Sequence, residues 1–205
     1  AMYRAITHWM LADGVDVEDA SAVAARVDEP VLTVGTDPAA PTIHVDGTDV
    51  AGPIRTPEVT AAVSAVASVP EVRTRMVALQ REIIGSGGIV VEGRDIGSAV
   101  APDADLKVFL TADPEVRARR RAAETLHAAP DAVAAEDVAR TEAAIQVRDA
   151  RDSTRAASPL TQADGAVVVD ATELTLEQVI ATVLDLVRVA SGPPAASSTA
   201  SPSAS

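Results

Sequence analysis

The stretch Ile89-Val90-Val91-Glu92-Gly93-Arg94-Asp95-Ile96-Gly97, with Asp105-Leu106-Lys107-Val108-Phe109-Leu110-Thr111-Ala112-Asp113 after it, decides the fold. Both segments hold short apolar runs typical of buried parallel strands, and an arginine-rich helical segment follows the second. In open α/β sheets, ligands bind beyond the carboxyl ends of the strands, so Arg94 and Asp95 lie where we expect a substrate. An arginine there suits a phosphate, and a neighbouring carboxylate suits a base or a sugar.

The rest of the chain alternates in the same way. We predict three core strands, at Gly88–Glu92, Leu106–Thr111 and Gly165–Asp170. Helices are predicted twice within residues 1–25, at Pro57–Ala67 and Val72–Ile84, from Pro114 onward, at Val138–Asp152 and at Leu174–Val189. Strands that alternate with helices indicate an α/β protein with a parallel sheet.

Three segments depart from this alternation. Two short runs, Pro30–Val34 and Thr42–Val45, with Asp46-Gly47 after them, predict a β-hairpin lodged among helices as a small insert. Residues 122–140 are rich in Ala, Glu and Asp and contain Pro130, so we expect a mobile, solvated connection. Residues 191–205 hold only Ser, Ala and Pro apart from one Gly and one Thr, a composition that predicts disorder.

Composition limits the classes of protein that fit. The 205 residues suffice for one domain with a small insert. A net charge of −13 argues against a general nucleic-acid surface, and the absence of cysteine excludes disulfides and thiolate metal sites. No apolar run approaches the roughly 18 residues of a membrane span, and no signal peptide is evident, so we expect a soluble cytoplasmic protein.

One phosphate-binding motif is missing from the sequence. The only lysine, Lys107, lies within a predicted strand, so no Gly-x-x-x-x-Gly-Lys-Ser/Thr loop is present. Histidines 8, 44 and 127 are scattered without the spacing of a zinc site.

Four segments together resemble bacterial cytidylate kinase, over residues 1 to about 188. They are Ala1-Met2-Tyr3-Arg4-Ala5, Ile54-Arg55-Thr56-Pro57-Glu58-Val59, Glu92–Gly97 with Pro102-Asp103-Ala104, and Arg148–Arg155. The resemblance implies a P-loop nucleoside-monophosphate-kinase fold, with helices on both faces of a parallel sheet. It also implies transfer of the terminal phosphoryl group of ATP, bound with Mg²⁺, to CMP or dCMP by a monomer.

The resemblance further implies that the family's first two strands and its phosphate loop precede Ala1. We therefore expect this chain to be truncated at its N-terminus and to be inactive alone. By resemblance, residues 26–62 form the monophosphate-binding insert and 122–147 the lid. The core comprises residues 1–25, 63–121 and 148–188, and residues 189–205 form a disordered tail.

The resemblance also assigns the candidate site residues. It implies that the CMP phosphate is bound by Arg4, Arg94 and Arg155. It implies that the base is bound by Ser64, Arg73 and Asp95. It implies that the ribose is bound by Arg148 and Asp152 and that Tyr3 lines the same pocket. The catalytic arginines are Arg94, Arg148 and Arg155, and the ATP and lid side holds Arg117, Arg120, Arg121 and Arg151. No metal ligand is identifiable.

Each assignment has a plainer alternative. Arg94 could pair with a nearby aspartate, and Ser64 could cap a helix. Arg73 could belong to a solvated face, and Arg148 to Asp152 could form a helical ladder of ion pairs. At the level of function, the alternatives are a non-catalytic nucleotide-binding or interaction module, and a nucleoside-monophosphate kinase with a different base preference.

Overall fold

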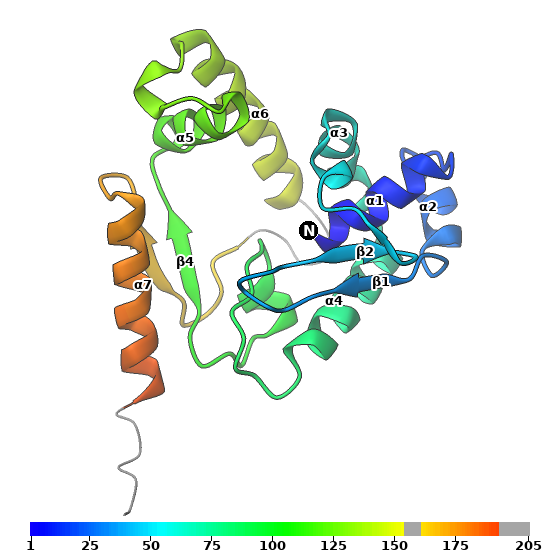
Figure 1. The fold of residues 1–205 in the computed structure, drawn as a ribbon, viewed down its shortest axis with the longest axis horizontal. Helices are drawn as coiled ribbons and strands as arrows, with labels where there is room; N and C mark the ends of the chain where they lie inside the picture. The colour runs from blue at the N-terminus through cyan, green and yellow to red at the C-terminus, as the bar shows by residue number, and fades with distance from the viewer. Residues whose placement is uncertain (154–160, 193–205) are drawn as a thin grey trace, which may run out of the picture.

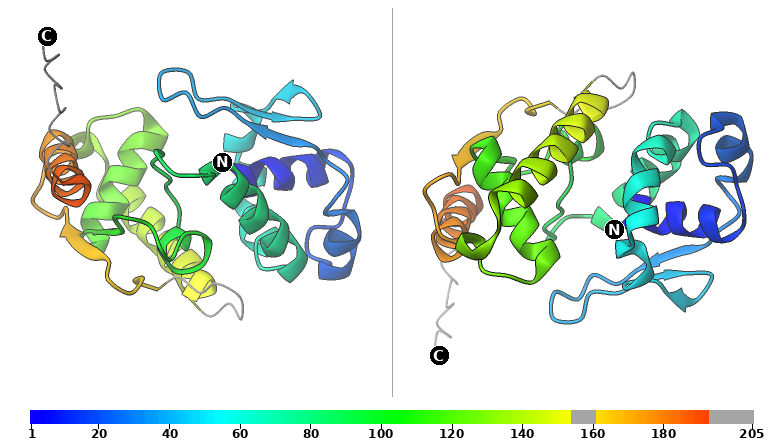
Figure 2. Two further views of the ribbon diagram at one scale, coloured as in Figure 1. Left: turned by 90° about the horizontal axis from the view of Figure 1, so that it is seen from below. Right: turned by 90° about the horizontal axis from the view of Figure 1, so that it is seen from above.

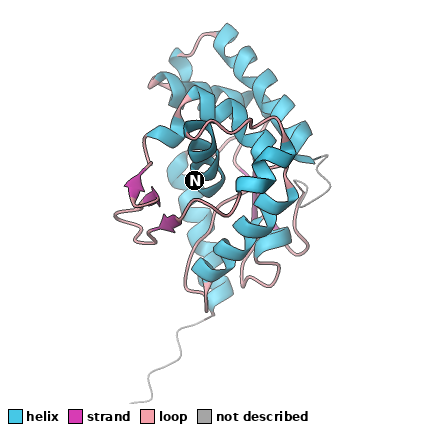
Figure 3. Ribbon diagram, turned by 90° about the vertical axis from the view of Figure 1, so that its right-hand side faces the viewer, coloured by secondary structure: helices cyan, strands magenta, loops and turns pink. Residues whose placement is uncertain are grey.

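The computed structural model describes residues 1–153 and 161–192, with the side chains of residues 151–153 excepted. The helices are α1 Met2–Ala12, α2 Ala20–Arg26, α3 Pro57–Val66, α4 Pro70–Ile84, α5 Pro114–Leu126, α6 Ala135–Ser153 and α7 Leu176–Ser191, with short helical turns η1 Pro53–Arg55, η2 Ile96–Val100 and η3 Pro130–Ala132. The strands are β1 Leu32–Val34, β2 Ile43–Val45, β3 Thr48–Asp49, β4 Val108–Thr111 and β5 Val167–Asp170. Helices dominate the described chain, and the strands are short (Figure 3).

Helices α1 to α4 and strands β1 to β3 gather around one hydrophobic core (Figure 1). Ile6 and Met10 of α1 and Val72 and Met76 of α4 are fully buried there. The three strands form an antiparallel sheet in the order β1-β2-β3, as the hairpin pattern predicts. Because successive strand residues point to opposite faces, Ile43 and Val45 of β2 both reach the core.

The remaining elements form a second group around β4 and β5 (Figure 2). These strands pair in parallel, from Val108 opposite Val167 to Thr111 opposite Asp170. Helix α5 follows β4 directly, with Asp113 as its N-cap and Pro114 in its first turn, and it packs against α6. A parallel sheet with crossing helices agrees with the predicted α/β class.

The predicted strand Gly88–Glu92 does not form. Within the described residues, β4 pairs only with β5, and the backbone of residues 88–92 runs without a ladder partner. Val90, predicted to be buried, is 91% exposed. A strand is stable only when a neighbour satisfies its N–H and C=O groups, and an apolar run does not supply that neighbour.

Residues 122–140, predicted to be a solvated connection, are mostly exposed but contain more helix than that prediction implied. Helix α5 continues to Leu126, and α6 already begins at Ala135. Ala122, Val133 and Val138 are buried in a small core between the two helices. Small apolar side chains at helical spacing allow close packing of α5 on α6 here, despite the charged surroundings.

Helix α7 begins with a capping box, in which Thr175 and Gln178 bond to each other's backbone N–H. Two of its leucines are open to solvent, since Leu176 is 69% and Leu184 49% exposed. The helix extends to Ser191, so the tail predicted from residue 189 starts later; residues 193–205 lie outside the described chain. No helix of the described chain combines the length and apolarity needed to cross a membrane.

Candidate functional site

A buried ion pair joins α4 to the start of η2. Arg73 is 4% and Asp95 7% exposed, and the Arg73 guanidinium donates to the Asp95 carboxylate. Arg73 also donates to the backbone oxygen of Ala67 at 3.3 Å. Its guanidinium carbon lies 5.5 Å from the centroid of the Tyr3 ring, a cation–π contact. Arg73 is therefore not on a solvated face; it forms a buried pair with Asp95.

A second charged group joins three elements. Arg94 donates to one carboxylate oxygen of Asp149 on α6, and Arg117 of α5 donates to the other oxygen at 3.0 Å. The three side chains remain partly exposed. Arg94 thus does pair with a nearby aspartate, the plainer alternative for this residue. Asp149 of α6 therefore pairs with residues of other elements.

Arg4 lies at the centre of a group of positive charges. Its Nη1 donates to the backbone oxygen of Ile54 at 2.7 Å and to Oγ1 of Thr60 at 3.0 Å. Partial burial lowers the pKa of Arg4, and the neighbouring charges of Arg148, Arg121 and Arg55 lower it further. Guanidinium groups from α1, η1, α5 and α6 therefore converge, and such a convergence favours binding of an anion.

The other predicted site residues are distributed as follows. Ser64 is half-buried on α3, and Arg148 is half-buried on α6. Arg120 donates to the backbone oxygens of Ala171 and Leu174, at 2.8 and 2.9 Å, so it joins α5 to the turn after β5. Arg121 pairs with Glu124 of its own helix. The side chains of Arg151 and Asp152, and all of Arg155, lie outside the described residues.

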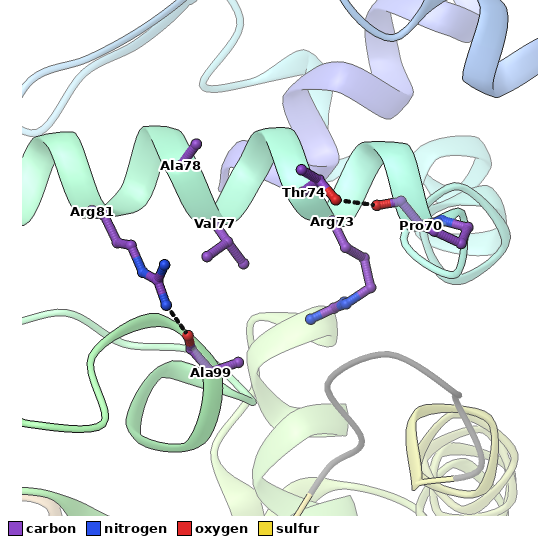
Figure 4. A pocket seen from close by; sticks show the side chains of 7 residues that line it. All are labelled: Pro70, Arg73, Thr74, Val77, Ala78, Arg81 and Ala99. Carbon is purple, nitrogen blue, oxygen red and sulfur yellow. Dashed lines mark hydrogen bonds between the residues drawn. The ribbon is translucent and has the colours of Figure 1, made fainter.

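A cavity of about 450 Å³ lies between α4 and η2 (Figure 4). It is lined by Pro70, Arg73, Thr74, Val77, Ala78, Arg81 and Ala99. Arg81 donates through Nε to the backbone oxygen of Val100 at 3.0 Å and through Nη2 to that of Ala99 at 2.8 Å. One wall of the cavity is therefore a direct connection between α4 and the end of η2.

Sequence reasoning gave no role to Asp149 or Arg81. Asp149 could have been singled out because it stands beside Arg148, yet its partners lie 55 and 32 positions away. Arg81 bonds only to backbone oxygens, which leave no pattern in the side chains.

Comparison with known proteins agrees with this geometry. The sequence profile of the family described as "Cytidylate kinase" matches residues 1–189. The chain belongs to the cytidylate kinase family. Members of this family are phosphotransferases, so the protein is an enzyme of that type.

Cytidylate kinases from two Streptomyces species and from Nocardia farcinica are among the similar curated proteins. The chain is 59% identical over 189 residues to the cytidylate kinase of Streptomyces griseus and 58% identical to that of Streptomyces avermitilis. Both alignments cover 91% of this chain and 78% of the relative. The cytidylate kinase of Nocardia farcinica is 50% identical over 181 residues, which are 88% of this chain and 76% of the relative.

Proposed function

We propose that this protein transfers the terminal phosphoryl group of ATP to CMP or dCMP and forms CDP or dCDP. The observation that carries the proposal is the buried Arg73–Asp95 pair, together with the arginines around Arg4. The pair offers fixed recognition of a base, and the arginines offer charge for a phosphate. Family membership is consistent with both roles.

The chemistry of cytosine matches the pair. Its exocyclic amino group is a donor that the Asp95 carboxylate can accept, and its ring nitrogen and carbonyl oxygen can accept from Arg73. Uracil places an oxygen where that amino group stands, so it would face a carboxylate without a shared proton. A site built to bond a substrate donor rejects the analogue that lacks it, because its own polar group is left unpaired.

The arginines suit the acceptor phosphate. Phosphoryl transfer requires alignment and positive charge around the transferring group more than it requires covalent chemistry from the protein. We assign Arg94 and Arg4 to the phosphate of CMP, with Arg155 in the same role by resemblance. We assign Arg148 a role close to the transferring group, which is supported by the effect of its charge on Arg4.

For ATP, the phosphoryl donor, the proposal assigns fewer residues. Arg117 and Arg121 of α5 are the described arginines assigned to ATP, with Arg151 by resemblance, whereas the hydrogen bonds of Arg120 suit a structural role. The described residues hold no group of three acidic or histidine side chains that could bind a metal, so we assign Mg²⁺ to the phosphates of ATP and derive no step through it. A monomer in the cytoplasm, without nucleic acid as a partner, remains part of the proposal.

Titration calorimetry with CMP, dCMP, UMP and AMP tests the proposal. CMP and dCMP should bind at least about tenfold more tightly than UMP or AMP, since about 1.4 kcal/mol corresponds to each factor of ten. Equal affinity for UMP would favour a kinase of different base preference. Binding of CMP without formation of CDP from ATP, by a version of the protein that also carries the family's phosphate loop, would favour a non-catalytic nucleotide-binding module.

A further inference from the structure

We propose that Arg81 is a positioning residue for base discrimination, because it holds the far end of the helical turn that begins at Asp95. The inference rests on the proposed function, since it concerns how the same site selects cytosine. Arg81 reaches no base itself in this account; it acts through the backbone that carries Asp95.

The turn is a compact unit with two ends. At its start, the Asp95 backbone oxygen accepts from the N–H groups of Ala99 at 2.9 Å and Val100 at 3.4 Å. At its end, the backbone oxygens of Ala99 and Val100 accept from Arg81. Any shift of the Ala99–Val100 backbone is therefore transmitted to Asp95 through these hydrogen bonds.

Arginines of helix α4 hydrogen-bond to both ends of this turn. Positions 73, 77 and 81 are four residues apart and share one face of α4, which Figure 4 shows directed toward the turn. Arg73 holds the Asp95 side chain, and Arg81, about 12 Å farther along the helix axis at 1.5 Å per residue, holds the terminal carbonyls. A single rigid helix thus sets the position of the carboxylate relative to its guanidinium partner.

In the described chain, the segment before Asp95 is held by the Arg94–Asp149 ion pair and not by a sheet. Residues 88–92 form no ladder, and Val90 is almost fully exposed. The backbone leading into Asp95 is therefore not anchored by a sheet in the described structure. Two hydrogen bonds from one planar guanidinium fix the turn in a single orientation, which a lysine with one charged nitrogen does less well.

Arg75 provides a matched control on the same helix. It also donates through its guanidinium to two backbone oxygens, those of Val27 and Pro30, but these lie on another side of α4. Replacement of Arg75 should therefore remove an equivalent structural bond without moving Asp95.

The test compares Arg81→Gln, Arg81→Lys and Arg75→Gln by calorimetry with CMP and UMP, with denaturant unfolding in parallel. We expect the ratio of CMP to UMP affinity to fall at least about tenfold in Arg81→Gln, with partial recovery in Arg81→Lys. In Arg75→Gln the ratio should stay at the wild-type value even if stability falls. An unchanged ratio in Arg81→Gln overturns the inference and leaves the proposed function intact.

Hydrogen exchange of the free protein gives a second test, which needs no ligand. The amide hydrogens of Ala99 and Val100 should exchange faster in Arg81→Gln than in wild type, and at the wild-type rate in Arg75→Gln. Equal exchange in all three proteins overturns the inference. Failure of the wild-type protein to prefer CMP over UMP would instead overturn the proposed function, and the exchange result would still decide whether Arg81 holds the turn.

Discussion

The carboxylate of Asp149 lies against the guanidinium of Arg94, 55 positions earlier in the chain. Its other oxygen accepts from Arg117, so one side chain of α6 joins the Gly93–Asp95 turn to α5. The proposed acceptor-phosphate arginine is thereby connected to an arginine of the proposed donor side. A phosphate that binds Arg94 must share it with Asp149 or displace Asp149.

Replacement of Asp149 by Asn should destabilise the protein by about 1 kcal/mol, because two partly exposed ion pairs are lost together. Chemical denaturation monitored by circular dichroism measures this change. Asp185→Asn is the control: Asp185 pairs with Arg188 at 2.7 Å, but the two side chains are 70% and 74% exposed, so its loss should have almost no effect. Equal changes in the two variants would contradict a network at Asp149.

Breaking the buried pair should cost far more. Arg73→Met leaves the Asp95 carboxylate buried without its counter-charge, so we expect a loss of about 3–5 kcal/mol in the free energy of unfolding. The double variant Arg73→Met with Asp95→Leu removes the stranded charge and should recover part of that loss. A double variant as unstable as the sum of the two single variants would contradict the pairing.

Asp95→Asn should reduce base discrimination. The amide keeps the size of the side chain, but its nitrogen is a donor and suits the uracil oxygen, while the charged hydrogen bond to the cytosine amino group is lost. Since hydrogen bonds to charged groups contribute about 1.5–3 kcal/mol, the ratio of CMP to UMP affinity should fall about 10- to 100-fold. Calorimetry with both nucleotides measures the ratio. Unchanged discrimination would rule out base reading by Asp95.

The turn between β2 and β3 was predictable because it carries its own signal. Asp46 and Gly47 both have positive φ, at 50° and 77°, as a two-residue hairpin turn requires, and Asp-Gly is a favoured pair for that geometry. The strand predicted at residues 88–92 failed for the opposite reason. Its apolar pattern is local, whereas a strand depends on a neighbouring backbone that no local pattern reports.

The site was predictable where it is formed by contacts between side chains that the sequence motifs contain. Arg73 and Asp95 were both singled out, and the structure brings them together in a buried pair. The role of Asp149 was obscured because its position on a helix also satisfies the spacing of an ion-pair ladder. The helix content of residues 122–140 was underestimated because alanine at Ala122 packs in a close helix contact, although the charged neighbours suggested a solvated segment.

The ends of β4 and β5 give a prediction that depends on pH. Hydrogen bonds from the Thr172 hydroxyl, at 2.6 Å, and from its backbone N–H lower the pKa of the Asp170 carboxyl below its ordinary value. The same hydroxyl oxygen accepts from the Asp113 N–H at 2.9 Å, so Thr172 connects the two strand ends. Because the folded-state pKa lies below the unfolded one, the ionised form of Asp170 stabilises the fold at neutral pH.

Thr172→Val should therefore lower the free energy of unfolding at neutral pH. The difference in this free energy between the variant and the wild type, called the gap below, should become smaller at low pH. The Asp170 contribution is complete above the unfolded pKa of about 3.9 and is lost as the pH falls through the lower folded pKa. Denaturant unfolding from neutral pH to below that range measures the gap. Thr182→Val is the control, since the Thr182 hydroxyl bonds only to the Gln178 backbone oxygen on α7 and should give no pH-dependent gap. A gap for Thr172→Val that stays constant across the range would mean that the hydroxyl acts through Asp113 alone.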